Sequence, residues 1–202
     1  MPLRVSSVLL AAGASKRMGR VKQLLPVGDK PAIRRCLDSI LSSGITDSIV
    51  VLGAHGAQIA DVIRGLSVTI TLNQEAESEM AESVRLGLKA IDSSSSGVLI
   101  CLSDHPLVSA KTFKSLLAGH AEDPDKIIVP LYNGRRAGHP TLFPRHVLGE
   151  LYTGLNLRDI LKRDPDRVKC IHVADEGVIL DMDTVEDYEK IDEYLKNQRT
   201  DK

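Results

Sequence analysis

Short aliphatic runs alternate along this chain with segments whose apolar residues recur every three or four positions. A continuous apolar run is typical of a strand buried on both faces, whereas recurrence at three or four positions predicts an amphipathic helix. The predicted strands are 8–12, 48–53, 68–72, 97–102, 126–131, 168–173 and 178–181. The predicted helices are 31–41, 58–64, 82–91, one after Ser109, 144–152, 157–162 and one from Thr184.

This order of elements predicts an α/β fold of three layers, with helices on both faces of a mainly parallel, Rossmann-like sheet. No linker or change in composition divides the chain, so we expect a single domain over residues 1–202. Parallel sheets of this kind bind ligands beyond the carboxyl ends of their strands. The polar segments after the first strand, after strand 97–102 and around Gly134 should therefore meet at one rim of the sheet.

The charge balance and the residue types exclude several classes of protein. The chain has 26 Lys and Arg against 27 Asp and Glu, so no basic surplus is available for a run of nucleic acid phosphates. Two Phe, four Tyr and no Trp offer no stacking platform for bases. Three cysteines without a CxxC pair predict neither a disulfide framework nor a zinc site. The apolar stretch at 5–12 is too short for a membrane span, so we expect a cytoplasmic protein without nucleic acid or membrane partners.

The loop after the first strand carries four basic residues within seven positions, namely Lys16, Arg17, Arg20 and Lys22. It is not a GxGxxG fingerprint, because Gly13 is the one glycine before Gly19, and it is not a Walker A loop, because five residues separate these glycines. A short turn with backbone N–H groups and basic side chains suits a small anion such as phosphate. A solvated basic surface loop is the alternative interpretation.

The string from Leu10 to Pro26 reads LAAGASKRMGRVKQLLP. It resembles the signature of the nucleotidyltransferases that act on molybdopterin, and most closely that of the molybdenum cofactor cytidylyltransferases. Two alanines before Gly13 match the cytidylyl branch, whereas the guanylyl branch usually has a second glycine there. The resemblance covers nearly the full chain and implies a fold of the nucleotidyltransferase type. It also implies nucleotide contacts from Ala11, Ala12, Gly13, Ala14, Ser15, Arg17, Lys22 and Ser83.

Ser83 lies in a second matching stretch, residues 80–88, which follows Asn73 in the chain. In the family this serine and the start of its helix lie beside the nucleobase, and the resemblance implies the same role for Ser83. A serine near a helix start is also common in the absence of any ligand. Glu79 stands where relatives usually carry glycine, so the local loop departs from the family pattern.

Two aspartates are the candidate ligands of a magnesium ion. Asp104 ends the most apolar predicted strand in the family's Asp-x-Pro pattern, and a carboxylate placed there can hold Mg²⁺ against phosphate oxygens. Asp183 lies in the stretch 180–187, which resembles the family's C-terminal motif. The plainer alternatives are a turn-forming acceptor for Asp104 and a solvated acid near a helix start for Asp183. His105 replaces the usual glutamine and is assigned no metal role.

Residues 134–140 resemble the Gly-His-Pro element that borders the pterin substrate in the family, with one residue more than is typical. The resemblance implies substrate contacts from Arg136, Gly138, His139 and Pro140 and, through a looser match at 156–158, from Arg158. The guanidinium groups of Arg135 and Arg136 suit the phosphate of such a substrate. A charged loop in solvent is the alternative.

The implied reaction is the Mg²⁺-dependent transfer of a cytidylyl group from CTP to the terminal phosphate of molybdopterin, with release of pyrophosphate. This displacement demands positioning and charge neutralisation rather than a protein nucleophile. The resemblance therefore gives catalytic roles to Arg17 at the β- and γ-phosphates, Lys22 at the α-phosphate and Asp104 at the metal.

Other interpretations of the sequence stay open. Within the same class, the donor is GTP or the acceptor is a different phosphorylated molecule. From another class, the chain is an accessory protein without catalytic activity that hands the cofactor to a molybdenum hydroxylase apoenzyme, although a carrier does not need Arg17, Lys22 and Asp104 together. An NAD-dependent oxidoreductase is disfavoured by the missing GxGxxG.

Overall fold

The computed structural model describes residues 3–13, 15, 17–75, 79–134 and 136–200. Within these residues one large sheet has the order β10-β7-β9-β6-β1-β4-β5, with β8 paired to β7, and β2 pairs with β3 in a small separate sheet. The large sheet contains β1 (Val5–Ala11), β4 (Asp47–Leu52), β5 (Thr69–Leu72), β6 (Gly97–Leu102), β7 (Ile127–Tyr132), β8 (Arg136–Ala137), β9 (Thr141–Pro144) and β10 (Val168–Val173). The small sheet contains β2 (Pro26–Val27) and β3 (Lys30–Pro31).

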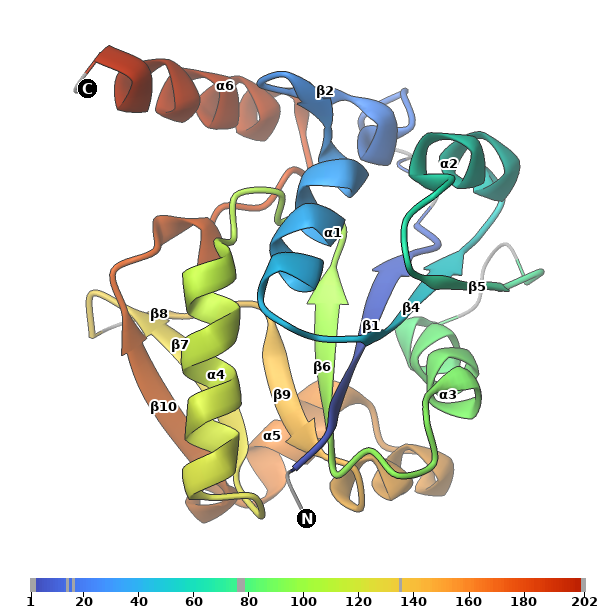
Figure 1. Ribbon diagram of the computed structural model, residues 1–202, viewed down its shortest axis with the longest axis vertical. Helices are drawn as coiled ribbons and strands as arrows, with labels where there is room; N and C mark the ends of the chain where they lie inside the picture. Colours follow the sequence, from blue (N-terminus) through green and yellow to red (C-terminus); the bar gives the residue numbers. More distant parts are fainter. Residues whose placement is uncertain (1–2, 14, 16, 76–78, 135, 201–202) are drawn as a thin grey trace.

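Helices connect most of these strands (Figure 1). The α-helices of the described residues are α1 (Ala32–Ser42), α2 (Gly56–Ile63), α3 (Met80–Ala90), α4 (Ala110–Glu122), α5 (Leu157–Arg163) and α6 (Val185–Thr200). The short 3-10 helices are η1 (Lys22–Leu24), η2 (Val147–Thr153), η3 (Pro165–Arg167) and η4 (Glu176–Val178). None of the helices that the model describes is long and apolar enough to cross a membrane.

Parallel pairing dominates the large sheet. β1 pairs in parallel with β4 and β6, β4 with β5, and β10 with β7. β9 is antiparallel to both β6 and β7, because the chain reverses after β7 and returns between these two strands. The prediction of an α/β fold with a mainly parallel sheet is therefore confirmed.

Successive residues of the central strand β1 pack against different layers of helices. Leu9 lies in one aliphatic core together with Ile33 of α1, Ile59 of α2 and Phe113 of α4. Val8 lies in a second core with Val84 of α3, and with residues of η2 and α5. Side chains alternate across a strand, so the two cores lie on opposite faces of the sheet. The three predicted layers are confirmed.

The end of the chain holds two corrections to the predicted elements. The predicted strand 178–181 is wrong, because Glu176–Val178 forms η4 and the Val178 carbonyl accepts a hydrogen bond from the backbone N–H of His139 rather than joining a ladder. Val178 is fully buried, so its apolar run reflects core packing and not a strand. The predicted helix 144–152 is instead the 3-10 segment η2, which follows β9.

Two predicted helix starts are confirmed by their caps. Ser109 Oγ accepts a hydrogen bond from the backbone N–H of Thr112 at the start of α4. Thr184 Oγ1 accepts from the backbone N–H of Asp187, whose carboxylate in turn accepts from the Thr184 backbone. This reciprocal cap fixes the start of α6. Through Met182 and Ile191 the same segment packs on Val27 and Ala32, next to the loop that follows β1.

Candidate functional site

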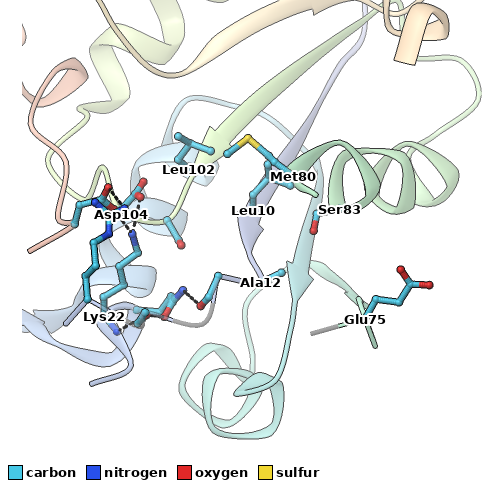
Figure 2. A pocket seen from close by; sticks show the side chains of 14 residues that line it. Leu10, Ala12, Lys22, Glu75, Met80, Ser83, Leu102 and Asp104 are labelled. Carbon is cyan, nitrogen blue, oxygen red and sulfur yellow. Dashed lines mark hydrogen bonds and ion pairs between the residues drawn. The ribbon is translucent and has the colours of Figure 1, made fainter. Parts of the chain in front are cut away.

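A cavity of about 420 Å³ opens at the carboxyl ends of β1 and β6. Predicted residues from four separate segments line it, namely Ala12, Gly13, Ser15, Arg17, Lys22, Ser83, Asp104 and Asp183. Figure 2 shows Lys22 and Asp104 together on one side of the cavity, and Ser83 and Glu75 on the other. Two of the three segments expected at this rim, those after β1 and β6, thus meet at the cavity, whereas no described residue of the segment around Gly134 lines it. The cavity has a charged side and a side without a cluster of charges.

Lys22 is the centre of the charged side. Its ammonium nitrogen lies 2.7 Å from Asp104 Oδ2 and 2.8 Å from Asp183 Oδ1. Asp104 follows β6 and Asp183 precedes α6, so the sheet and the C-terminal segment each supply one carboxylate. Arg17 donates to the other oxygen of Asp183 at 2.8 Å. Two carboxylates therefore face two cations in an alternating row.

Partial burial makes this row electrostatically strong. The side chains of Lys22 and Asp104 are 12% and 19% exposed, whereas that of Arg17 is 70% exposed. Burial alone would lower the pKa of the Lys22 ammonium, but Asp104 and Asp183 outweigh it and raise this pKa above its ordinary value. The hydrogen bond from Lys22 holds the pKa of the Asp183 carboxyl below its ordinary value. Lys22 and Asp183 are therefore both charged at neutral pH.

Asp104 has an unused ligand atom. Its Oδ1 is buried and has no hydrogen-bond partner within the part of the chain that the structure describes. A buried carboxylate oxygen is costly without a partner, and oxygen is the ligand that Mg²⁺ prefers. The described residues hold no group of three or more His, Cys, Asp and Glu placed for a metal. Mg²⁺ typically binds one or two carboxylates and completes its shell with waters and substrate phosphates, so Asp104 and Asp183 fit that ion.

Ser15 and Gln23 shape the loop between β1 and η1. Ser15 has a backbone φ of +52°, and its hydroxyl oxygen accepts from the backbone N–H of Lys22 at 3.2 Å. Gln23, 1% exposed, reaches back to the same loop, and sequence reasoning missed it. Its signal was its place between the motif lysine and the Leu-Leu-Pro run. The predicted contact at Ala14, together with the basic Lys16, lies outside the described residues.

The other side of the cavity is lined by α3 and by Glu75, which follows β5 in the chain. The buried Ser83 hydroxyl accepts a hydrogen bond from Asn73 Nδ2 at 2.9 Å, and both side chains are less than a tenth exposed. Met80 is 55% exposed and lines the cavity beside Ser83. Ala11, in contrast, is buried in the aliphatic core and does not line the cavity.

His139 and Pro140 lie against a separate, small cavity of about 10 Å³. The His139 ring centroid is 5.2 Å from that of His105, and the His139–Pro140 peptide bond is cis. Burial, with a smaller effect of His105, lowers the pKa of His139 to about 4, so its ring is neutral at pH 7. A side chain at Gly138 would clash with the Val178 carbonyl. These residues do not line the larger cavity.

The two predicted arginines of the substrate side are less informative. Arg136 of β8 pairs with Tyr132 of β7. Neither the Arg136 side chain nor Arg135 is among the described parts of the chain. Arg158 is exposed on α5 and does not line the cavity. Figure 1 shows α5 near the end of the sheet where β6 begins, away from the cavity rim. The structure therefore does not bring Arg158 to the other predicted residues.

The chain has relatives of known sequence and structure. Over 193 residues it is 31% identical to nicotine blue oxidoreductase of Paenarthrobacter nicotinovorans, covering 90% of this chain and 93% of that protein. It is also 32% identical over 125 residues to the bifunctional protein GlmU of Exiguobacterium sibiricum, covering 61% of this chain and only 27% of GlmU.

The fold is similar to that of Rv0371c from Mycobacterium tuberculosis H37Rv. The two chains superpose with a TM-score of 0.82 at 27% identity, over 96% of this chain and 99% of Rv0371c. A second structure of Rv0371c is a complex with manganese, and it superposes with a TM-score of 0.79 over 94% and 98% of the two chains at 27% identity. The structural likeness thus extends to a protein that binds a divalent cation.

The model of the MobA-like NTP transferase domain matches residues 7–168. This match includes the loop after β1, Ser83 and Asp104, which line the cavity described above. Asp183 lies beyond the matched range and reaches the site through the C-terminal segment. The chain therefore belongs to the MobA-like NTP transferase family and is a nucleotidyltransferase of this type.

Proposed function

We propose that this protein transfers a cytidylyl group from CTP to the terminal phosphate of molybdopterin, in a Mg²⁺-dependent reaction that releases pyrophosphate. The observation that carries the proposal is the row of Arg17, Asp183, Lys22 and Asp104 beside the loop that follows β1. A row of this kind supplies both positive groups for a triphosphate and carboxylate oxygens for a cation.

The reaction is an in-line displacement at the α-phosphorus. An oxygen of the acceptor phosphate forms a bond to this phosphorus while the bond to the β-phosphate oxygen breaks, and pyrophosphate leaves with its electron pair. Arg17 neutralises the β- and γ-phosphates from the exposed side of the cavity, and backbone N–H groups after Gly13 bind them from the loop. Lys22 stabilises the charge that develops at the α-phosphate.

Lys22 has to change partners to perform this role. In the structure its ammonium is held by two carboxylates, at 2.7 and 2.8 Å. The same carboxylates, Asp104 and Asp183, would hold Mg²⁺, which screens the phosphate charges when bound. With both carboxylates engaged by such a cation, Lys22 would turn toward the phosphates. The partner change thus couples metal binding to the positioning of Lys22.

The preference for CTP is supported by the base side of the cavity. Ala12 lies where the guanylyl branch usually has glycine, so its methyl group takes up room in the cavity wall. Ser83 accepts its hydrogen bond from Asn73, so the serine hydroxyl proton is available to a second acceptor. The carbonyl oxygen of cytosine is such an acceptor, as is that of guanine, so the preference for CTP over GTP rests on Ala12.

The acceptor side of the proposal concerns the Gly-His-Pro segment. Arg136, Gly138, His139 and Pro140 belong to the Gly-His-Pro segment, and we propose that this segment borders the pterin, with Arg136 near its phosphate. Arg158 joins them only if α5 approaches the rim when the substrate binds. A molybdenum hydroxylase apoenzyme is the proposed recipient of the finished dinucleotide cofactor.

The decisive experiment measures pyrophosphate release from CTP, GTP, ATP and UTP with Mg²⁺, each with and without molybdopterin. We expect release only when molybdopterin is present, and fastest with CTP. Lys22→Met should abolish release, whereas Arg20→Ala, in the same loop but outside the cavity lining, should keep it. Release that is fastest with GTP would move the protein to the guanylyl branch. Binding of molybdopterin without release would favour an accessory carrier.

A second candidate follows from the relative that is named an oxidoreductase. That protein is 31% identical over 90% of this chain, although the loop after β1 lacks GxGxxG. An NAD-dependent oxidoreductase would transfer a hydride between the nicotinamide cofactor and a second substrate. The test is the oxidation of NADH and NADPH in the presence of a redox dye, with Lys22→Met as the matched variant. If NADH and NADPH are oxidised no faster with the protein than without it, this candidate is excluded.

A further inference from the structure

Gln23 is a buried polar side chain in the wall of the nucleotide cavity. It lies in the middle of η1 and is 1% exposed. Its Nε2 donates to the carbonyl of Gly13 and its Oε1 accepts from the hydroxyl of Ser15, both at 3.4 Å. A buried amide is unfavourable unless hydrogen-bonded, so these two bonds decide where this side chain points. Both of its partners belong to the loop after β1.

The loop that Gln23 holds is strained at Ser15. A backbone φ of +52° is unusual for a residue with a side chain, and it persists only when surrounding groups fix it. Three contacts do so here. The Ser15 hydroxyl bonds to Gln23 on one side and accepts from the Lys22 backbone N–H on the other, while its carbonyl accepts from Met18.

We infer that Gln23 is a positioning residue for nucleotide binding, and this inference rests on the function proposed above. Gln23 holds Gly13 and Ser15 in place at the wall of the cavity that takes the triphosphate. It acts through Gly13 and Ser15 and exchanges no proton or bond with the substrate. The amide suits this task because it donates and accepts at once, and it adds no charge beside the phosphates.

The test uses a ligand that has phosphates but no base. Inorganic tripolyphosphate with Mg²⁺ is titrated by calorimetry into the wild type, Gln23→Met and Leu24→Ala. Methionine keeps the length of the side chain and removes both hydrogen bonds. Leu24→Ala removes packing from the same turn, because Leu24 packs against the aliphatic core. It therefore serves as the control for a loss of stability in this turn.

We expect Gln23→Met to weaken tripolyphosphate binding about tenfold and Leu24→Ala to leave it within twofold. In turnover, Gln23→Met should raise KM for the nucleotide while kcat at saturation changes little. Equal weakening by both variants, or unchanged binding by Gln23→Met, overturns the inference. Ser15→Ala in the Gln23→Met background should cost less than in the wild type, because the two residues share a bond.

A second readout needs no ligand. Trypsin cleaves after arginine, and Arg17 and Arg20 lie in this loop. Gln23→Met should be cut there faster than Leu24→Ala at equal global stability, whereas equal rates of cutting contradict a positioning role. A wild type that binds neither CTP nor tripolyphosphate refutes the proposed function, and the inference falls with it. Binding of both ligands by the wild type, and equally tight binding by Gln23→Met, refutes the inference alone.

Discussion

Replacing Lys22 by methionine tests the charged row directly. The substitution keeps the aliphatic stem and removes an ammonium that two carboxylates share, at 2.7 and 2.8 Å. Asp104 then loses the ammonium that pairs with it, and its Oδ1 already has no partner among the described residues. Breaking a buried ion pair by removing one partner costs about 3–5 kcal/mol, and partial exposure reduces this to about 2–3 kcal/mol.

Urea unfolding without metal, at pH 7, measures this loss. For a domain of this size, about 2–3 kcal/mol corresponds to a decrease in Tm of roughly 5–10 °C. Mg²⁺ or Mn²⁺ should restore more stability to Lys22→Met than to the wild type, because the cation no longer competes with the ammonium. Calorimetric titration with Mn²⁺ alone should show tighter binding to the variant for the same reason.

The loss of stability in Lys22→Met should also depend on pH. The lowered pKa of Asp183 means that its pairing stabilises the fold above the ordinary carboxyl pKa of 3.8 and is lost as the pH falls through the lowered value. The difference in the free energy of unfolding between wild type and Lys22→Met should therefore decrease as the pH falls. Arg17→Met is the matched control, because this arginine is 70% exposed and should contribute less than about 1 kcal/mol. Equal stability of both variants, with equal gains from metal, would refute the reasoning.

Three further predictions concern single residues. Asp104→Asn should lower kcat at least a hundredfold, because it removes a carboxylate that would hold the Mg²⁺ near the charge developing on the phosphates. A pyrophosphate assay over a series of Mg²⁺ concentrations checks this. His139 has a pKa near 4 in the fold against 6.5 ordinarily, so the unfolded chain takes up its proton first on acidification. Stability should fall by up to about 3 kcal/mol between pH 6.5 and 4, and His139→Gln should flatten this fall in urea titrations, whereas an unchanged slope contradicts the assignment. Gly87→Ala should cost about 1–3 kcal/mol in thermal unfolding, because its Cβ would overlap Val8, and an unchanged Tm would show that α3 shifts freely.

The sequence was most informative where local chemistry decides the structure. β1 and β6 are aliphatic runs buried on both faces, and their neighbours in the sheet follow from that burial. Lys22 and Asp104 belong to local motifs, so their place at the carboxyl ends of strands could be predicted. The cap at Ser109 could be predicted for the same reason.

Other features depend on contacts between distant segments. Lys22 and Asp183 are 161 positions apart, and neither motif indicates that they form an ion pair. Gln23 has no unusual neighbours in the sequence, and its burial arises only when η1 folds back on the loop. The run from Val178 has the composition of a strand, yet Val178 ends the 3-10 helix η4 and is buried in the core.

The ion pair between Lys22 and Asp183 also bears on how the protein is made. A ribosome delivers the loop after β1 long before it delivers residue 183, and the intervening segment must collapse before the two can meet. A nascent chain released before that point would hold most of the sheet but only one of the two acidic partners of Lys22. Enzymatic competence should therefore emerge late in translation, well after the central strands have paired.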